Sequence, residues 1–388
     1  MVAFSKVAVA ALAGFAAAHP GEKHDEQKMK REIVARDNHA RNGARSLAKC
    51  GDADFAKALK TRSVQRRAER VQNLRKDLGI KSAARKDKRT LEDLEGYEAV
   101  NHNMTGTSDN GIFTALEEVF SANTSCLLAP EVTDGPYYVT GEYFRSNVKE
   151  ADFTEGVDLY LEVQYIDINT CQPIPKVAVD VWNCNATGYY SGVESGEGGL
   201  NTTFLRGIQL SDHDGVVQFE TIFPGHYDGR AVHTHLLSHT GAEIESNGTV
   251  SVYNGAVAHI GQLFWPNDLR EQVETTYPYT ENTQSLTTND DDMWSVLAAD
   301  ENFDPIPEYV YLGDSIEDGL FAWIQIGING SADYTDNDYY GIAAYLAEDG
   351  GHSTGYTVGG GDAGGDGGNG TAPTGTGAMP TGAAPTSA

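Results

Sequence analysis

The sequence predicts a mainly β protein, an antiparallel β-sandwich that follows an N-terminal helical region and precedes a disordered C-terminal tail. In the middle of the chain apolar and polar residues alternate, which is typical of strands that bury one face. Before this part, apolar residues recur every three to five positions, which is typical of an amphipathic helix. The last stretch is rich in Gly, Thr and Ser and has almost no large apolar residue.

The first 18 residues have the layout of a cleaved signal peptide, with Lys6 followed by apolar Val7 to Ala16 and small residues up to Ala18. No other segment is apolar over the roughly 20 residues that a membrane span needs. We therefore expect a secreted, extracellular protein with no membrane span. Residues 19–45 are polar and charged, and they are interpreted as a leader or pro-segment.

Residues 46–125 are interpreted as a basic helical region and linker, with a long helix over 53–78 and a short one at 111–120. The net charge of the chain is −28 at pH 7, yet most of its 28 Lys and Arg precede residue 101. A body this acidic repels nucleic acid and anionic membranes, so we exclude both as its partners. The basic segment 57–89 is interpreted as a solvated helix that packs on the acidic body.

Residues 126–348 are expected to form the sandwich, because short alternating segments are separated by turns such as Asp212 to Gly215. The clearest expected strands cover 159–165, 177–181, 217–223 and 322–328. Residues 349–388 should form the disordered tail, because they cannot bury enough surface to offset the entropy of folding.

Cysteines and glycosylation motifs support the secretory interpretation. Four cysteines in an oxidising compartment suggest two disulfides, for which sequence alone allows three pairings. We favour Cys171 with Cys184, which closes a short strand-turn-strand segment, and Cys50 with Cys126, which ties the N-terminal region to the body. Asn-x-Ser/Thr motifs of a glycoprotein occur at Asn103, Asn123, Asn185, Asn201, Asn247, Asn329 and Asn369.

Candidate metal ligands gather around His233-Thr234-His235. In a strand, both imidazoles project from the same face about 7 Å apart, so they can share one metal ion. A two-histidine, one-carboxylate iron site usually takes an acid close to the first histidine, and Thr234 occupies that place. Tyr227 in a glycine-rich turn and Tyr190 beside a glycine-rich loop are further candidates, although a buried tyrosine in a β core is commonplace.

Four motifs follow one another in the predicted sandwich. They are Pro130-Glu131-Val132-Thr133-Asp134-Gly135-Pro136-Tyr137-Tyr138, the run from Asp180-Val181-Trp182 to Gly188-Tyr189-Tyr190-Ser191, Phe204-Leu205-Arg206-Gly207, and the run from Asp212 through Pro224-Gly225-His226-Tyr227-Asp228-Gly229-Arg230 to His235. In this order they resemble the signature of the intradiol ring-cleavage dioxygenases, most closely the extracellular fungal branch. The similarity spans about residues 126–330.

This resemblance implies one Fe(III) ion per chain, bound by Tyr190, Tyr227, His233 and His235. The spacing of Trp, Gly and Tyr in the family selects Tyr190 over its neighbour. Fe(III) favours anionic oxygen and can deprotonate a phenol whose ordinary pKa is about 10. The implied partners are a small catechol-type diol and O2, and the implied product is a cis,cis-muconate-type diacid.

The resemblance also implies roles for the remaining site residues. Tyr227 leaves the metal when the diol binds and acts as an internal base, and Arg230 stabilises negative charge developing on the ring. Gln262 matches a glutamine that the family places beside the ligands. The walls of the substrate site are expected from Gly135, Pro136 and Tyr137.

Two other classes of function are weighed against the enzyme. A β-sandwich of this size can be a catalytically inactive binding module of the cell surface. The presence of all four ligand types together with Arg230 argues against a decayed site. A zinc hydrolase would need a general-base Glu beside the histidines, which is absent, and Tyr is an uncommon zinc ligand. The physiological diol and the oligomeric state remain open.

Overall fold

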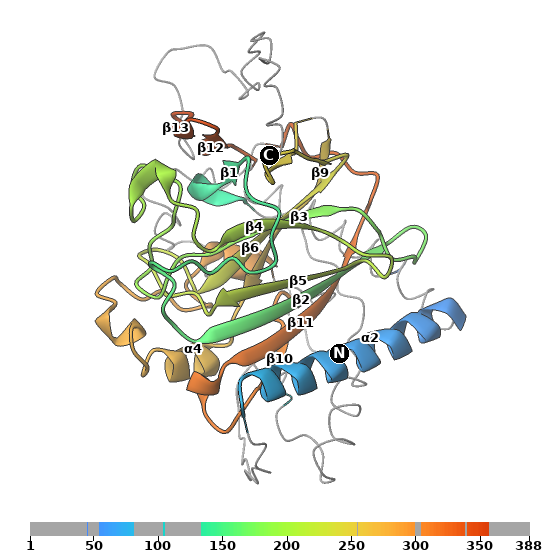
Figure 1. The fold of residues 1–388 in the computed structure, drawn as a ribbon, viewed down its shortest axis with the longest axis horizontal. Coiled ribbons are helices and arrows are strands. Elements are labelled where there is room, and N and C mark those ends of the chain that lie inside the picture. Colours follow the sequence, from blue (N-terminus) through green and yellow to red (C-terminus); the bar gives the residue numbers. More distant parts are fainter. Residues whose placement is uncertain are drawn as a thin grey trace, which may run out of the picture.

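The computed structural model describes residues 45, 54–80, 104, 133–253, 255–298, 304–337 and 340–356. Two four-stranded sheets face each other in this part of the chain and form the sandwich (Figure 1). The first has the order β10-β11-β2-β5, with β2 at Asp158–Asp167, β5 at Val216–Ile222, β10 at Glu308–Tyr311 and β11 at Leu320–Ile328. The second has the order β4-β3-β6-β9, with β3 at Ala178–Trp182, β4 at Arg206–Leu210, β6 at His233–Thr240 and β9 at Ala256–Phe264.

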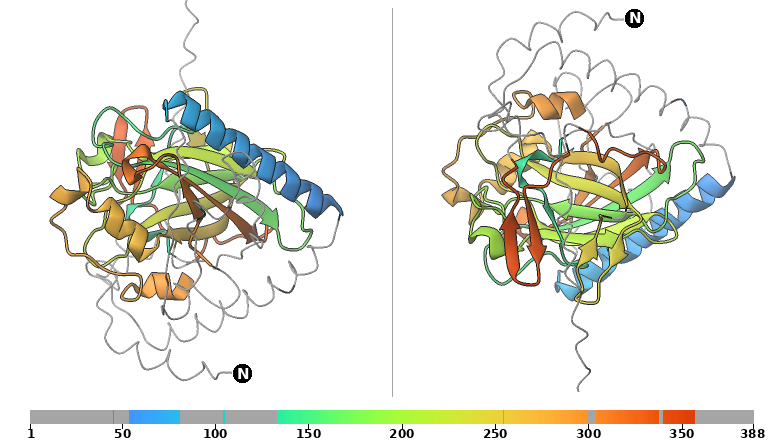
Figure 2. Two further views of the ribbon diagram at one scale, coloured as in Figure 1. Left: turned by 90° about the horizontal axis from the view of Figure 1, so that it is seen from below. Right: turned by 90° about the horizontal axis from the view of Figure 1, so that it is seen from above.

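Shorter elements surround the two sheets (Figures 1 and 2). The strands are β1 (Val139–Thr140), β7 (Glu243–Ile244), β8 (Val250–Ser251), β12 (Ala344–Ala347) and β13 (Gly350–Ser353). The α-helices are α4 (Asn267–Val273) and α5 (Met293–Ala298), and the 3-10 helices are η3 (Gly135–Tyr137), η4 (Gly199–Asn201), η5 (Tyr279–Glu281) and η6 (Ile316–Asp318). β13 lies past the tail boundary expected at residue 348. The short helix expected at 111–120 lies outside the described residues.

The predicted β-sandwich is confirmed, with one refinement of strand direction. Within the two four-stranded sheets the pairs are antiparallel except that β2 runs parallel to β11, and in the small sheet β1 runs parallel to β12. Parallel neighbours need a long connection, and most of the sandwich lies between β2 and β11 in sequence. The alternating apolar residues of β2, which include Leu159, Leu161 and Val163, belong to the core between the sheets.

A long helix, α2 (Asp54–Asp77), covers the outer face of the first sheet (Figures 1 and 2). Val71 and Leu74 belong to a buried cluster with Tyr160 of β2 and with Phe321 and Trp323 of β11. These sheet residues alternate with the core residues, so the second face of β2 is buried as well. The helix expected over 53–78 is therefore confirmed, and the described part of the basic segment 57–89 packs on the acidic body, whereas residues 81–89 lie outside the described residues.

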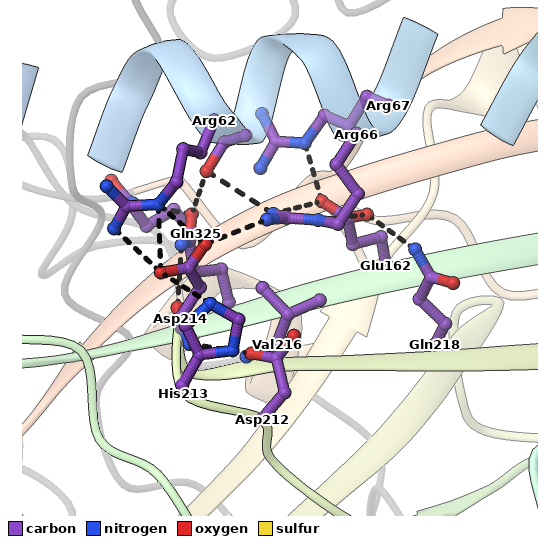
Figure 3. A network of polar contacts seen from close by, with 12 residues as sticks. Arg62, Arg66, Arg67, Glu162, Asp212, His213, Asp214, Val216, Gln218 and Gln325 are labelled. Carbon is purple, nitrogen blue, oxygen red and sulfur yellow. Dashed lines mark hydrogen bonds and ion pairs between the residues drawn. The ribbon is translucent and has the colours of Figure 1, made fainter. Parts of the chain in front are cut away.

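Arginines of α2 pair with carboxylates of the sheet and of the turn before β5 (Figure 3). Arg67 Nε lies 2.8 Å from Glu162 Oε1, and the two side chains are 2% and 0% exposed. Arg66 Nη2 lies 3.0 Å from the same oxygen. Arg62 Nη2 lies 2.7 Å from Asp214 Oδ1. Burial raises the pKa of Glu162, but the charges of Arg67 and Arg66 outweigh it and leave that pKa below its usual value.

The expected disulfide between Cys171 and Cys184 is wrong. Cys171 is disulfide-bonded, whereas Cys184 is a buried free thiol. The amide of Cys171 donates a hydrogen bond to the carbonyl oxygen of Asp167, the last residue of β2. Cys184 Sγ donates to the carbonyl oxygen of Gly225, which follows the end of β5, and that end of β5 pairs with the first residue of β2. Ten residues of β2 span roughly 30 Å at about 3.3 Å each, far beyond the about 7 Å limit between the Cα atoms of a disulfide. Cys50 and Cys126, for which the second bond was expected, lie outside the described residues.

Candidate active site

The strand β6 opens with the two histidines expected to share a metal ion. His233 and His235 are each 1% exposed and project from the same face, with 3.0 Å between their Nε2 atoms. His233 Nδ1 lies 2.6 Å from the carbonyl oxygen of Ala231. A carbonyl can only accept, so Nδ1 carries the proton and the Nε2 lone pair of a neutral His233 points toward the cluster.

Two tyrosines from different loops complete the cluster. The hydroxyl of Tyr190 lies 3.4 Å from His233 Nε2, and that of Tyr227 lies 3.3 Å from the same atom. Both side chains are buried, whereas the neighbouring Tyr189 is 46% exposed. Of the neighbours Tyr189 and Tyr190, the geometry therefore brings only Tyr190 to the histidines.

The turn that carries Tyr190 is organised by one side chain. Asn185 Oδ1 accepts hydrogen bonds from the amides of Thr187 and Tyr189 at 3.1 and 3.0 Å. Its Nδ2 donates to Glu197 at 2.6 Å, and the residue is 4% exposed. A glycan cannot be attached to Nδ2 in this folded arrangement, so the glycosylation expected at Asn185 does not fit the structure.

The turn that carries Tyr227 packs tightly against the Asn185 turn. Gly225 donates its amide hydrogen to the carbonyl oxygen of Asn185 at 3.1 Å. A Cβ atom at Gly225 would lie 2.3 Å from the carbonyl oxygen of Ala186. The absence of a side chain at Gly225 thus lets the two tyrosine-bearing loops approach each other.

Aromatic rings fix the orientation of the donors. Trp182, at the end of β3, pairs in register with His235 and stacks on its imidazole, with ring centroids 4.5 Å apart and 3° between planes. Tyr137 stacks on Tyr190 at 4.7 Å and meets Tyr227 edge-on at 6.2 Å. Tyr137 therefore lies against the cluster where the resemblance expects a wall of the substrate site. Gly135 and Pro136 precede it in η3, and Gly135 is buried.

Arg230 lies beside the cluster and is fully buried. Its Nη2 donates to Gln262 Oε1 at 2.5 Å, and Gln262 Nε2 donates to the carbonyl oxygen of Thr133 at 2.6 Å. Gln262 also pairs with His235 in the register of β6 and β9. Burial lowers the pKa of Arg230, but Asp292, Tyr227 and Tyr190 together outweigh it and raise that pKa overall. The structure thus joins the expected Arg230 and Gln262 in one network beside the candidate metal ligands.

Burial raises the pKa of both phenols well above the ordinary tyrosine value, and the Arg230 cation acts in the opposite direction on each. Deprotonating them in this site therefore requires further positive charge nearby. Two phenol oxygens and two imidazole nitrogens are a donor set that fits a hard, highly charged cation. The residues present thus fit an iron(III) ion, for which Tyr190, Tyr227, His233 and His235 are the candidate ligands.

Two supporting residues were missed by sequence reasoning. Asp292 accepts a hydrogen bond from Arg230 Nε at 2.9 Å, and it belongs to a run of three aspartates that is typical of an exposed loop. Arg206 Nη2 donates to the Ser191 carbonyl oxygen at 2.8 Å, and its guanidinium lies 5.9 Å from the ring centre of Tyr190. Arg206 lies in one of the motifs quoted above, which was a signal for its proximity to the site.

Comparisons with known proteins agree with these motifs. Residues 133–265 match the family model described as "Dioxygenase". A catechol 1,2-dioxygenase of Pseudomonas sp. (strain EST1001) is 30% identical over 102 residues, which is 25% of this chain and 32% of that protein. The chain thus matches about a third of the length of this curated relative.

Solved structures include similar proteins from several organisms. An intradiol ring-cleavage dioxygenase from Tetranychus urticae is 30% identical, with a TM-score of 0.44, over 54% of this chain and 97% of that one. Catechol 1,2-dioxygenase from Acinetobacter sp. ADP1 is 19% identical, with a TM-score of 0.35, over 52% and 62%. From the sequence matches across the site-bearing region, this chain belongs to the intradiol ring-cleavage dioxygenase family.

Proposed function

We propose that this chain is a secreted, Fe(III)-dependent dioxygenase that cleaves the ring of small catechol-type diols between the two hydroxyl-bearing carbons. The observation that carries the proposal is the convergence of two phenols on two imidazoles, with the buried Arg230 beside them. Both atoms of O2 enter the product, a cis,cis-muconate-type diacid, so no external reductant is needed.

Each residue of the site has a role in this proposal. An iron(III) ion held by the two phenols and the two imidazoles would supply the positive charge that keeps the phenols ionised, and it would activate the diol toward O2. Tyr227 receives a proton from a diol hydroxyl at its phenol oxygen. Arg230 is held in a dry site, where its charge stabilises negative charge on the ring more strongly than it would in water. Tyr137, stacked on Tyr190, excludes water from one side of the cluster.

The secretory route is proposed from residues 1–18, which lie outside the described residues. In the described part of the chain, no helix combines the length and the apolar character needed to cross a bilayer. Mass spectrometry of the protein from the culture medium of its expression host tests the route. We expect a mature chain that begins near His19, and a chain that retains Met1 and stays in the cells would contradict it.

The function is tested by iron content, visible absorption and oxygen uptake with catechol, hydroxyquinol and protocatechuate. We expect about one iron per chain, a red-brown colour from tyrosinate-to-iron charge transfer, and uptake with at least one diol. Tyr190→Phe should lose colour and most turnover, whereas the matched control Tyr189→Phe, at an exposed ring, should keep both. A colourless protein with stoichiometric zinc, or equal behaviour of the two variants, would overturn the assignment.

A further inference from the structure

Arg230 is anchored by a carboxylate that lies 62 residues further along the chain. Asp292 Oδ2 accepts hydrogen bonds from Arg230 Nε at 2.9 Å and from the amide of Ala231 at 2.8 Å. The two side chains of this ion pair are fully buried. Asp292 therefore holds both the guanidinium and the backbone next to it, only a short distance along the chain from the histidines of β6.

The other oxygen of Asp292 is used as well. Oδ1 accepts hydrogen bonds from the amides of Trp294 and Ser295 at 2.8 and 3.4 Å, at the start of α5. All four contacts are donated by N–H groups, so each oxygen must be an acceptor. An asparagine at this position has nearly the same size but offers only one acceptor oxygen, and its NH2 group would face N–H donors whichever way it turned. The site thus requires a carboxylate at position 292.

We propose that Asp292 is a positioning residue of the active site, which aims the Arg230 guanidinium at the substrate ring while Gln262 holds its Nη2. The proposal rests on the proposed dioxygenase function. Asp292 touches none of the four candidate metal ligands in the described contacts, and it reaches the site through Arg230 and through the amide of Ala231, a residue whose carbonyl oxygen accepts a hydrogen bond from His233. Retained iron and colour in a variant at position 292 separate the first route from the second. A displacement of a catalytic group by about 1 Å is enough to reduce turnover on the order of 10²-fold.

The experiment is a double-mutant cycle of Asp292→Asn and Arg230→Leu in the iron-loaded full chain. The readouts are iron content, visible absorption, anaerobic binding of catechol by visible titration, and kcat from oxygen uptake. Asp290→Asn, which removes the same charge from an exposed position two residues away, is the matched control.

We expect Asp292→Asn to keep its iron, its colour and its catechol affinity within about threefold, and to lose kcat by roughly 10- to 100-fold. Adding Asp292→Asn to Arg230→Leu should lower kcat no further, because the residue that Asp292 positions is already absent. Losses that multiply in the double variant, or a kcat of Asp292→Asn equal to that of Asp290→Asn, would overturn the role of Asp292. A wild-type protein that takes up no oxygen with any diol would overturn the proposed function itself, and these outcomes are distinguishable.

Discussion

Replacing Glu162 with glutamine is expected to destabilise the packing of α2 on the sheet. Glu162 is fully buried and accepts four hydrogen bonds (Figure 3). Its Oε1 accepts from Arg66 Nη2 and Arg67 Nε, and its Oε2 accepts from Arg66 Nε and Gln218 Nε2. A glutamine keeps the shape but turns one acceptor into a donor that faces other N–H groups. It also removes the negative charge closest to the buried Arg67.

The size of the effect follows from this loss. Removing one partner of a buried ion pair costs about 3–5 kcal/mol, because an uncompensated charge stays buried. Arg66 keeps Asp214, 3.7 Å away, and Glu308 also acts on the charge of Arg67, so we expect the lower end, about 3 kcal/mol. For a domain of about 150–250 residues, each kcal/mol shifts the unfolding midpoint by roughly 2–4 °C, which predicts a loss of roughly 6–12 °C.

Thermal unfolding followed by circular dichroism measures this shift. Glu155→Gln is the matched control, because it makes the same change at an exposed residue close by in sequence. Replacing Arg67 and Glu162 together with methionine should recover part of the loss, since a well-packed apolar pair leaves no buried charge from either residue. Equal midpoints for Glu162→Gln and Glu155→Gln would refute the reasoning.

Two further predictions concern pH and the tyrosine turns. The hydrogen bond from Arg62 lowers the pKa of Asp214, and the charges of Arg67 and Arg66 lower that of Glu162. Each carboxylate stabilises the fold above its unfolded pKa, so the unfolding midpoint should fall as the pH drops below about 4.5. Thermal unfolding between pH 2 and 7 tests this, and an equally steep fall in Glu162→Gln would exclude a contribution from Glu162. Gly225→Ala should reduce iron content and turnover together, because its Cβ would force apart the loops that carry Tyr190 and Tyr227. Full iron content in that variant, measured by atomic emission, would show that the loops tolerate the separation.

Local patterns in the sequence predicted the parts of the fold that depend on local order. Alternating residues placed β2, β3, β5 and β11 close to their observed bounds, because a strand with one buried face has a period of two. The apolar spacing of α2 predicted its length, because the buried face of a helix repeats every three to four residues. The motif spacing also selected Tyr190 over Tyr189, and the structure places only Tyr190 against the histidines.

Contacts between distant residues could not be predicted in this way. Asp292 lies in an acidic run that is typical of a solvent-exposed loop, and no short-range sequence pattern connects it with Arg230, 62 residues earlier. The pairing of Arg67 with Glu162 joins residues 95 positions apart. The expected bond between Cys171 and Cys184 was wrong for a related reason. Closeness in sequence was taken for closeness in space, although the two residues lie near opposite ends of β2.

The two buried acids, Glu162 and Asp292, each compensate the charge of a buried arginine, at different places in the fold. Each accepts four hydrogen bonds from N–H donors, and each neutralises a buried arginine. The arginine beside Glu162 belongs to α2, so an amide at 162 should lower the unfolding temperature and leave kcat unchanged. The arginine beside Asp292 faces the candidate metal site, so an amide at position 292 should act mainly on kcat and lower it. The same chemical substitution at two positions therefore separates the stability of this protein from its turnover.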